Sequence, residues 1–314
     1  MDERRILREL DKTPMDHKRM LQAIECLCHL EHAPGYSVLG HSILGREIPL
    51  LTLGNGNTEV LYVGAHHGME WITSILLLRF VFDVCSAMER SSPIYGKSVG
   101  DLLSHYTLYI VPMLNPDGVE YQIHGVSEDN PLHDRLLGMN GGSRDFSSWQ
   151  ANARGVDLNH NYDAGFAEYK LWELQNDILG GKPTRYSGEC PESEPEVAYL
   201  CGFIRFREGL KGILTLHTQG EEIFYRSGGK AVPDGLRIAK RLAVLSGYRL
   251  SVAEGPAAYG GLTDWCIRRL GLPSFTLECG KGKNPLPLSQ AFLIYAHLRQ
   301  ALFTFPTLFA PIEQ

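Results

Sequence analysis

The chain has 314 residues, of which 44% are hydrophobic and 21% are charged, which is ordinary for a globular protein with a sizeable core. A formal net charge of −6 argues against the basic surface of a nucleic-acid-binding domain. Neither an apolar signal region near Met1 nor an apolar run long enough to span a membrane is present, so we expect a cytoplasmic protein.

The spacing of apolar residues predicts alternating helices and strands. Residues 1–15 are charged, and we expect this segment to be loosely held. In chain order the pattern then predicts a helix over 16–32, strands over 36–39, 48–53 and 60–63, a helix over 72–89 and a strand over 106–113. After these come a turn over 115–118, a long irregular loop over 124–155, a helix over 194–207, a strand over 210–216, a helix over 234–246, a strand over 272–277 and a helix over 288–304. This alternation, with no linker-like change in composition, predicts one α/β domain over residues 1–314 with a largely parallel sheet.

Side chains that can bind a metal stand at the ends of three predicted strands. His67 and Glu70 follow the strand over 60–63, His217 follows the strand over 210–216, and Glu278 follows the strand over 272–277. The carboxyl ends of parallel strands meet at one edge of a sheet, where ligands bind. Two imidazoles and one carboxylate are typical protein ligands of a catalytic zinc ion, which keeps a fourth position for water. We therefore predict His67, Glu70 and His217 as zinc ligands, and Glu278 as the carboxylate that moves the proton of the water.

Each of these residues also has an ordinary structural explanation. A histidine at the end of an apolar strand, such as His217, is more often a hydrogen-bonded core residue than a ligand. A single glutamate after a strand, such as Glu278, is usually a surface charge. The spacing alone leaves open whether the four side chains converge in space.

Several motifs, in the same order, resemble those of the zinc metallocarboxypeptidases of the carboxypeptidase A type. The resemblance covers roughly residues 36–305 and is carried by His67-Gly68-Met69-Glu70-Trp71, Asn115-Pro116-Asp117-Gly118, the segment 155–161, Leu216-His217, Gly261-Leu262-Thr263-Asp264-Trp265 and Phe275-Thr276-Leu277-Glu278. It implies a single α/β domain with a twisted, mixed sheet flanked by helices. It also implies one zinc ion bound by His67, Glu70 and His217, with Glu278 as the general base and acid.

The departures from the family pattern concern the substrate. The family's Asn-Arg pair, which holds a peptide's terminal carboxylate, reads Asn159-His160 here, and an imidazole cannot reproduce the bidentate fork of arginine. Where the family has an arginine that stabilises the oxyanion, this chain has Gln150, so that zinc, Arg144 or Arg154 would take that role. We expect the substrate to be contacted by Asn159, His160, Gln150, Arg144 and Tyr259. Tyr259 directly precedes Gly260-Gly261, whereas the family's mobile tyrosine lies four residues before that glycine pair.

Residues 149–161 and 278–287 look closest to one branch of the family, the bacterial γ-D-glutamyl-meso-diaminopimelate peptidases. This similarity implies hydrolysis of that amide in cell-wall stem peptides, and a peptide or muropeptide as the partner. His160, Lys281 and Lys283 would contact the carboxylates of such a substrate, although the two lysines also suit a solvated loop. Two other functions stay open, an ordinary carboxypeptidase that trims peptide C-termini and a catalytically inactive binding protein with the same fold. The sequence does not indicate an oligomeric state.

Overall fold

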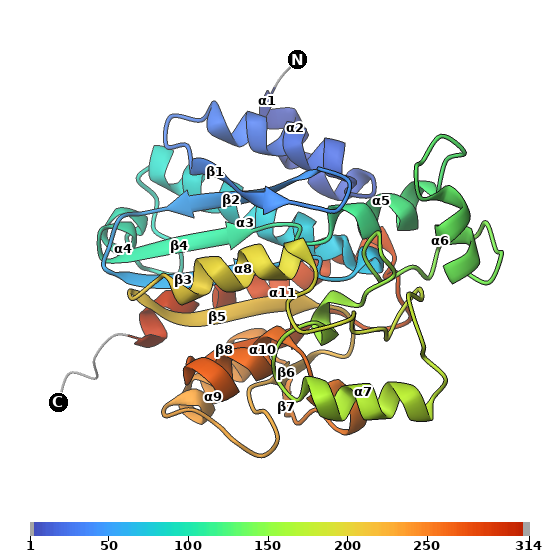
Figure 1. The fold of residues 1–314 in the computed structure, drawn as a ribbon. Coiled ribbons are helices and arrows are strands. Elements are labelled where there is room, and N and C mark those ends of the chain that lie inside the picture. The colour runs from blue at the N-terminus through green and yellow to red at the C-terminus, as the bar shows by residue number, and fades with distance from the viewer. Residues whose placement is uncertain (1–2, 310–314) are drawn as a thin grey trace.

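The computed structural model describes residues 3–309, which form a single α/β domain around a mixed, eight-stranded sheet (Figure 1). The strand order is β1-β2-β4-β3-β5-β8-β6-β7. The strands are β1 (Gly35–His41), β2 (Glu47–Leu53), β3 (Thr58–Val63), β4 (Tyr106–Val111), β5 (Leu210–His217), β6 (Glu222–Phe224), β7 (Arg249–Ser251) and β8 (Ser274–Glu278). The helices are α1 (Glu3–Arg8), α2 (His17–Cys28), α3 (Ile72–Glu89), α4 (Val99–His105), α5 (Pro116–His124), α6 (His133–Met139), α7 (Phe166–Gln175), α8 (Pro195–Arg205), α9 (Gly235–Ser246), α10 (Leu262–Trp265) and α11 (Ala291–Thr304).

The centre of the sheet is parallel and its two sides are antiparallel. β4, β3, β5 and β8 run parallel, whereas β2 pairs antiparallel with β4 and β6 pairs antiparallel with β8. The central strands are apolar along most of their length because both of their faces are covered. The prediction of a twisted, mixed and largely parallel sheet flanked by helices is confirmed.

Successive side chains of the central strands point to opposite faces of the sheet and pack into two separate cores. Val60 and Tyr62 of β3 belong to the larger core, which lies against α3 and α11, whereas Leu61 and Val63 belong to a second core against α8 and α10. The alternation follows from the period of two in a strand. With both faces packed in this way, the carboxyl ends of the parallel strands are held rigidly at one edge of the sheet.

The segment 1–15, which we expect to be loosely held, contributes apolar side chains to the core in its described part. Leu7, Leu10 and Met15 are fully buried and belong to the larger core, and the short turn Leu10–Lys12 packs on α3. These few apolar side chains anchor the segment in spite of its charged composition, because each removes its whole surface from water. Residues 1–2 lie outside the described residues.

Several elements differ in detail from the expectation. The helix expected over 16–32 begins after Asp16, whose side chain caps it by accepting a hydrogen bond from the backbone N–H of Arg19, and it ends at Cys28. The expected turn at Asn115 is the N-terminus of α5, where the Asn115 side chain accepts from the N–H of Gly118. The expected loop over 124–155 contains α6, and the helices α4, α7 and α10 and the strands β6 and β7 were not predicted.

Residues 3–309 contain no helix with both the length and the apolar composition that crossing a bilayer demands.

Candidate metal centre and substrate pocket

The ends of three neighbouring strands bring the predicted ionisable groups together. His67 and Glu70 follow β3, and the parallel register of β5 and β8 places His217 directly beside Glu278. The chain leaves β3 through Ala65, which has a φ of 45°, in the left-handed region. This unusual conformation turns the backbone sharply, and the N–H of Ala65 donates to the hydroxyl of Thr73 at 2.8 Å.

Gly68 allows the loop that carries His67 and Glu70 to pack closely on α5. A Cβ atom at this position would lie 2.4 Å from the backbone oxygen of Gly118. Any larger residue would therefore push the loop away from α5, and with it both side chains. The glycine in the His-Gly-Met-Glu motif has this steric cause.

Two histidines and one carboxylate converge to a buried cluster. Nδ1 of His67 lies 2.9 Å from Oε1 of Glu70, and Nδ1 of His217 lies 3.0 Å from Oε2 of Glu70. The two Nδ1 atoms are 3.3 Å apart. Ligands of a tetrahedral zinc ion with bonds of about 2.0–2.2 Å lie roughly 3.3–3.5 Å from one another, so that the observed spacing is close to that of a zinc site. The three buried groups direct their lone pairs to one point, where a divalent cation would compensate them more fully than hydrogen bonds among the three side chains can.

A second carboxylate fixes the ring of His67 from behind. Nε2 of His67 donates to Oδ1 of Asp157 at 3.1 Å, which leaves Nδ1 as the atom that faces the cluster. Although burial opposes it, the charges of Glu70 and Asp157 raise the pKa of His67 well above its usual value. A histidine oriented by a carboxylate in this way is typical of metal sites.

The ring of His217 is held by packing. His66 lies against it with ring centroids 5.0 Å apart, and His66 is itself bonded through Nε2 to the hydroxyl of Tyr162 at 3.1 Å. Nε2 of His217 is buried and has no hydrogen-bond partner within residues 3–309. The orientation of His217 therefore depends on its neighbours in the core and on whatever Nδ1 binds.

Glu278 lies at the edge of the cluster and has the character of a group that exchanges protons near neutral pH. Burial, together with the nearby carboxylate of Glu70, raises the pKa of Glu278 to about 8. No hydrogen bond or ion pair holds the Glu278 side chain among the described residues, so its oxygens are free to contact a ligand. A carboxylate that lies beside His217 and lines the pocket suits general base and acid catalysis.

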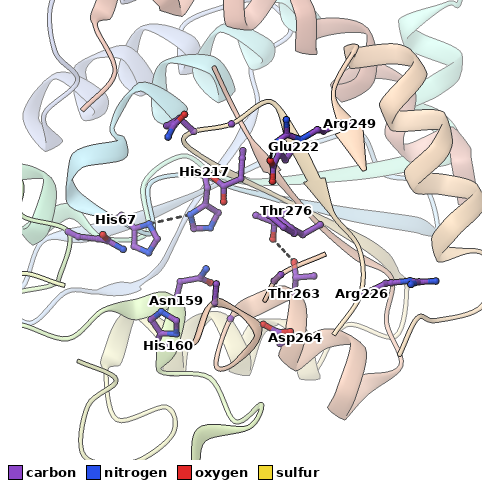
Figure 2. A pocket seen from close by; sticks show the side chains of 18 residues that line it. His67, Asn159, His160, His217, Glu222, Arg226, Arg249, Thr263, Asp264 and Thr276 are labelled. Carbon is purple, nitrogen blue, oxygen red and sulfur yellow. Dashed lines mark hydrogen bonds and ion pairs between the residues drawn. The ribbon is translucent and has the colours of Figure 1, made fainter. Parts of the chain in front are cut away.

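The cluster opens into a pocket of about 490 Å³, a size typical of small-molecule and peptide side-chain sites (Figure 2). His67, His217 and Glu278 form one end of it, and Thr263 and Thr276 lie along the wall, joined by a hydrogen bond of 2.8 Å. The remaining wall carries charged side chains of both signs, Glu222, Arg226, Arg249 and Asp264. The pocket therefore suits a substrate side chain that is polar and charged.

Asn159 and His160, which we expect to contact the substrate, both line the pocket. Oδ1 of Asn159 accepts from the backbone N–H of Leu262 at 3.2 Å, which orients the amide. The His160 ring stacks on Tyr169 of α7 at 4.1 Å, and its Nδ1 donates to the backbone oxygen of Tyr259 at 2.8 Å. Burial lowers the pKa of His160, so that this ring is neutral near pH 7.

The other predicted substrate contacts divide into two groups. Gln150 lines the pocket, with its side chain held between Asp157 at 3.0 Å and Thr184 at 3.1 Å. Tyr259 contributes its backbone oxygen to His160, but its side chain does not line the pocket. Arg144 lies away from the pocket, largely exposed and paired with Glu128 at 3.5 Å.

The remaining basic candidates also have partners elsewhere. Arg154 pairs with Glu194 at 3.7 Å, and Lys281 pairs with Glu221 at 2.6 Å on the exposed loop after β8. Lys283 is exposed on the same loop. None of the three lines the pocket.

The sequence reasoning missed both the support of the metal centre and the charged wall of the pocket. Asp157 lies in the segment 155–161 that carries part of the family resemblance, two residues before Asn159, but nothing in that segment indicates a contact with His67. Arg226 and Arg249 follow or begin strands of only three residues, which are too short to show a period. Their place in the wall of the pocket is visible only in three dimensions.

A second acidic group with a histidine, formed by Asp16, Glu120 and His124, lies at the surface. Asp16 caps α2 and pairs with His124 at 3.0 Å, and Glu120 accepts from the backbone N–H of His17 at 2.9 Å. These interactions account for the group as a helix cap and a surface ion pair.

Known proteins resemble this chain in sequence and in fold. The sequence profile of the zinc carboxypeptidase family matches residues 32–300. A γ-D-glutamyl-L-diamino acid endopeptidase of Lysinibacillus sphaericus is 35% identical over 259 residues, which are 82% of this chain and 63% of that protein, so the match spans less than two thirds of that relative. Human carboxypeptidase B is 28% identical over 77% of this chain and 57% of its own length. Bovine thrombin-activatable fibrinolysis inhibitor has the same fold, with a TM-score of 0.70 and 21% identity over 95% of this chain and 97% of that structure.

Proposed function

Because the chain belongs to the zinc carboxypeptidase family and is thus a zinc peptidase, we propose that it hydrolyses the amide between γ-D-glutamate and meso-diaminopimelate in peptidoglycan stem peptides. One observation carries the proposal, namely that the cluster of His67, Glu70 and His217 opens into a pocket lined by both arginine and carboxylate side chains. Diaminopimelate carries an ammonium and a carboxylate at the far end of its side chain. The name of the relative from Lysinibacillus sphaericus supports the same substrate class.

In this proposal His67, Glu70 and His217 hold the zinc ion. Zinc bound there lowers the pKa of water and polarises the scissile carbonyl. Asp157 keeps Nδ1 of His67 turned toward the ion by accepting a hydrogen bond from Nε2 at 3.1 Å. Glu70 faces both histidines, and its carboxylate lowers the net charge of the filled site.

Glu278 moves the proton. Its carboxylate takes a proton from the attacking water, and the resulting carboxylic acid gives that proton to the nitrogen of the leaving amine as the C–N bond breaks. No other carboxylate of the pocket lies beside His217 in the register of the sheet.

Asn159 and His160 then face the part of the substrate next to the cleaved bond. A neutral imidazole offers at most one hydrogen bond there and no fixed positive charge. A site without an arginine that binds a carboxylate through two hydrogen bonds suits a substrate in which the carboxylate next to the cleaved amide is held weakly, or is itself joined to a further residue. This feature favours a cell-wall peptidase over an enzyme that depends on a free peptide C-terminus.

A second candidate is an ordinary carboxypeptidase that removes a C-terminal residue with a basic side chain. The buried carboxylate of Asp264 in the pocket favours it, since such a group can pair with the ammonium of lysine. A third, a catalytically inactive binding protein, would bind zinc and ligand without turnover.

The experiment uses zinc-replete protein and mass spectrometry of two substrates, L-Ala-γ-D-Glu-meso-diaminopimelate and a peptide with a free C-terminal L-lysine. Cleavage of the first at the γ-D-glutamyl bond, lost in Glu278→Gln with zinc retained, is the expected result. Cleavage of the second alone would replace the proposal with the carboxypeptidase, and zinc binding without either cleavage would favour the binding protein. The cytoplasmic location stays a prediction that cell fractionation can test.

A further inference from the structure

The pocket has a charged end that lies away from the metal centre. In Figure 2 Arg226 lies on the side of the pocket opposite His67, and Asp264 lies below the threonine pair. Arg226 follows β6 by two residues, whereas Asp264 belongs to α10, so that two separate elements place a cation and an anion around the same cavity. Neither residue belongs to the group that would hold zinc or move protons.

Arg226 lacks the partners that the other arginines nearby possess. Its Nε is buried without a hydrogen-bond partner, and no ion pair involves it within residues 3–309. By contrast, Arg249 pairs with Glu222, and Arg268 donates to the hydroxyl of Ser227 and to the backbone oxygen of Ala258. A guanidinium with a buried, unpaired N–H is costly to leave unsatisfied, and a carboxylate is the ligand that matches its geometry.

Asp264 offers the opposite charge. Its side chain is only 6% exposed and lines the pocket. Burial raises the pKa of Asp264 to about 6, although Arg268 and the Ser227 hydroxyl oppose the shift, so that the group is still ionised near pH 7. A ligand ammonium would compensate the charge that burial leaves unfavourable.

We propose that this end of the pocket is a subsite for the amino-acid group at the distal end of a diamino dicarboxylic side chain, with Arg226 binding its carboxylate and Asp264 its ammonium. The assignment rests on the proposed function and names the residues that select the substrate. Lysine has the ammonium but no distal carboxylate, so that a lysine-containing stem peptide leaves Arg226 unpaired. Arg226 is thus the residue that distinguishes diaminopimelate from lysine.

The test compares three tripeptides, L-Ala-γ-D-Glu followed by meso-diaminopimelate, by meso-diaminopimelate amidated at its distal carboxylate, or by L-lysine. The wild-type protein is expected to cleave the first with a kcat/KM about 10–100-fold above the other two, as for loss of one charged hydrogen-bonded pair. Arg226→Gln should bring the first substrate down to the level of the others and change those little. Arg237→Gln, which removes an arginine that is paired with Asp234 and does not line the pocket, should keep the wild-type ratio.

Three results would overturn the subsite: equal cleavage of all three peptides by the wild-type protein, an equal loss for all three in Arg226→Gln, or loss of the ratio in Arg237→Gln but not in Arg226→Gln. The amidated peptide decides the matter on the unmutated protein if Arg226→Gln does not fold. Failure of the proposed function looks different, since the wild-type protein would then cleave none of the three while cutting an ordinary C-terminal peptide, and the subsite would fall with it.

Calorimetry gives a second readout that does not require turnover. In a Glu278→Gln background the diaminopimelate peptide should bind about 10–100-fold more tightly than the lysine peptide, and addition of Arg226→Gln should remove this difference. An unchanged difference after loss of Arg226 would also contradict the assignment.

Discussion

Replacing Asp157 with asparagine should weaken zinc binding without removing any zinc ligand. Asp157 is 1% exposed, and four N–H groups donate to it. Oδ1 accepts from His67 Nε2 at 3.1 Å and from the N–H of Asn159 at 3.2 Å, whereas Oδ2 accepts from Gln150 at 3.0 Å and from the N–H of Arg185 at 3.2 Å. An asparagine has one oxygen, so that its amide nitrogen must face two of these donors.

The size of the effect follows from this geometry. If the asparagine oxygen keeps His67, the bond to the imidazole loses its charged acceptor; if the nitrogen faces His67, the ring loses its partner altogether. Loss of such a supporting carboxylate typically costs 10–100-fold in metal affinity, about 1.4–2.7 kcal/mol. We therefore expect the Kd for zinc to rise by about 10–100-fold in Asp157→Asn.

Competition with a chromogenic zinc chelator at pH 7 measures the Kd. The matched control is Glu173→Gln, which alters another buried carboxylate, 1% exposed and bonded to Lys170 and to the N–H of Ser187, that does not contact the cluster. The control should lose stability but keep zinc affinity within about twofold. A folded Asp157→Asn protein with wild-type zinc affinity would refute the view that Asp157 orients His67.

Three further variants test other parts of the structure. Glu278→Gln should lower kcat by about 10²–10⁴-fold while metal analysis still finds one zinc ion, because only the proton carrier is lost; turnover near the wild-type rate would contradict its role. Burial raises the pKa of Glu196 to about 8, so that the folded protein holds a proton there between about pH 4.3 and 8 that the unfolded chain has released. The free energy of unfolding of the wild type should fall as the pH rises across that window. Denaturant unfolding of Glu196→Gln should show a free energy of unfolding that exceeds the wild-type value by an amount that grows between pH 5 and 9 and reaches about 2–5 kcal/mol; an excess that does not depend on pH would be evidence against this. Leu10→Ala should cost about 2–5 kcal/mol in the free energy of unfolding, whereas a cost below about 0.5 kcal/mol would support a loosely held N-terminal segment.

The metal centre could be predicted from the sequence because long strands carry it. β3 and β5 are six and eight residues long, enough for an apolar run to identify them and to locate their carboxyl ends. Parallel pairing then brings those ends to one edge whatever the loops do. His67, His217 and Glu278 meet for this reason, and Glu70 follows because it is three residues from His67.

The partners of that centre could not be predicted, since they come from loops whose contacts are set by the whole fold. Asp157 lies 90 residues from His67 in the chain, and no local pattern links the two. Arg144 and Arg154 show the same problem in reverse. Both are close to Gln150 in the sequence, and the structure pairs them with Glu128 and Glu194 away from the pocket.

Substrate choice is the least predictable property because it depends on the shortest elements. Arg226 follows β6, a strand of three residues, and His160 owes its orientation to Tyr169 on α7, a helix that the apolar pattern did not indicate. A short strand is stable only when its neighbours supply the pairing, here β8 through the register of Glu222 with Glu278. The residues expected to carry out the chemistry thus lie at the ends of long strands that can be recognised in the sequence, whereas the residues expected to select the substrate lie on short elements that are stable only when packed on those strands. Changes confined to β6, β7 and α7 should accordingly alter which amide is cleaved while leaving the zinc site and Glu278 in place.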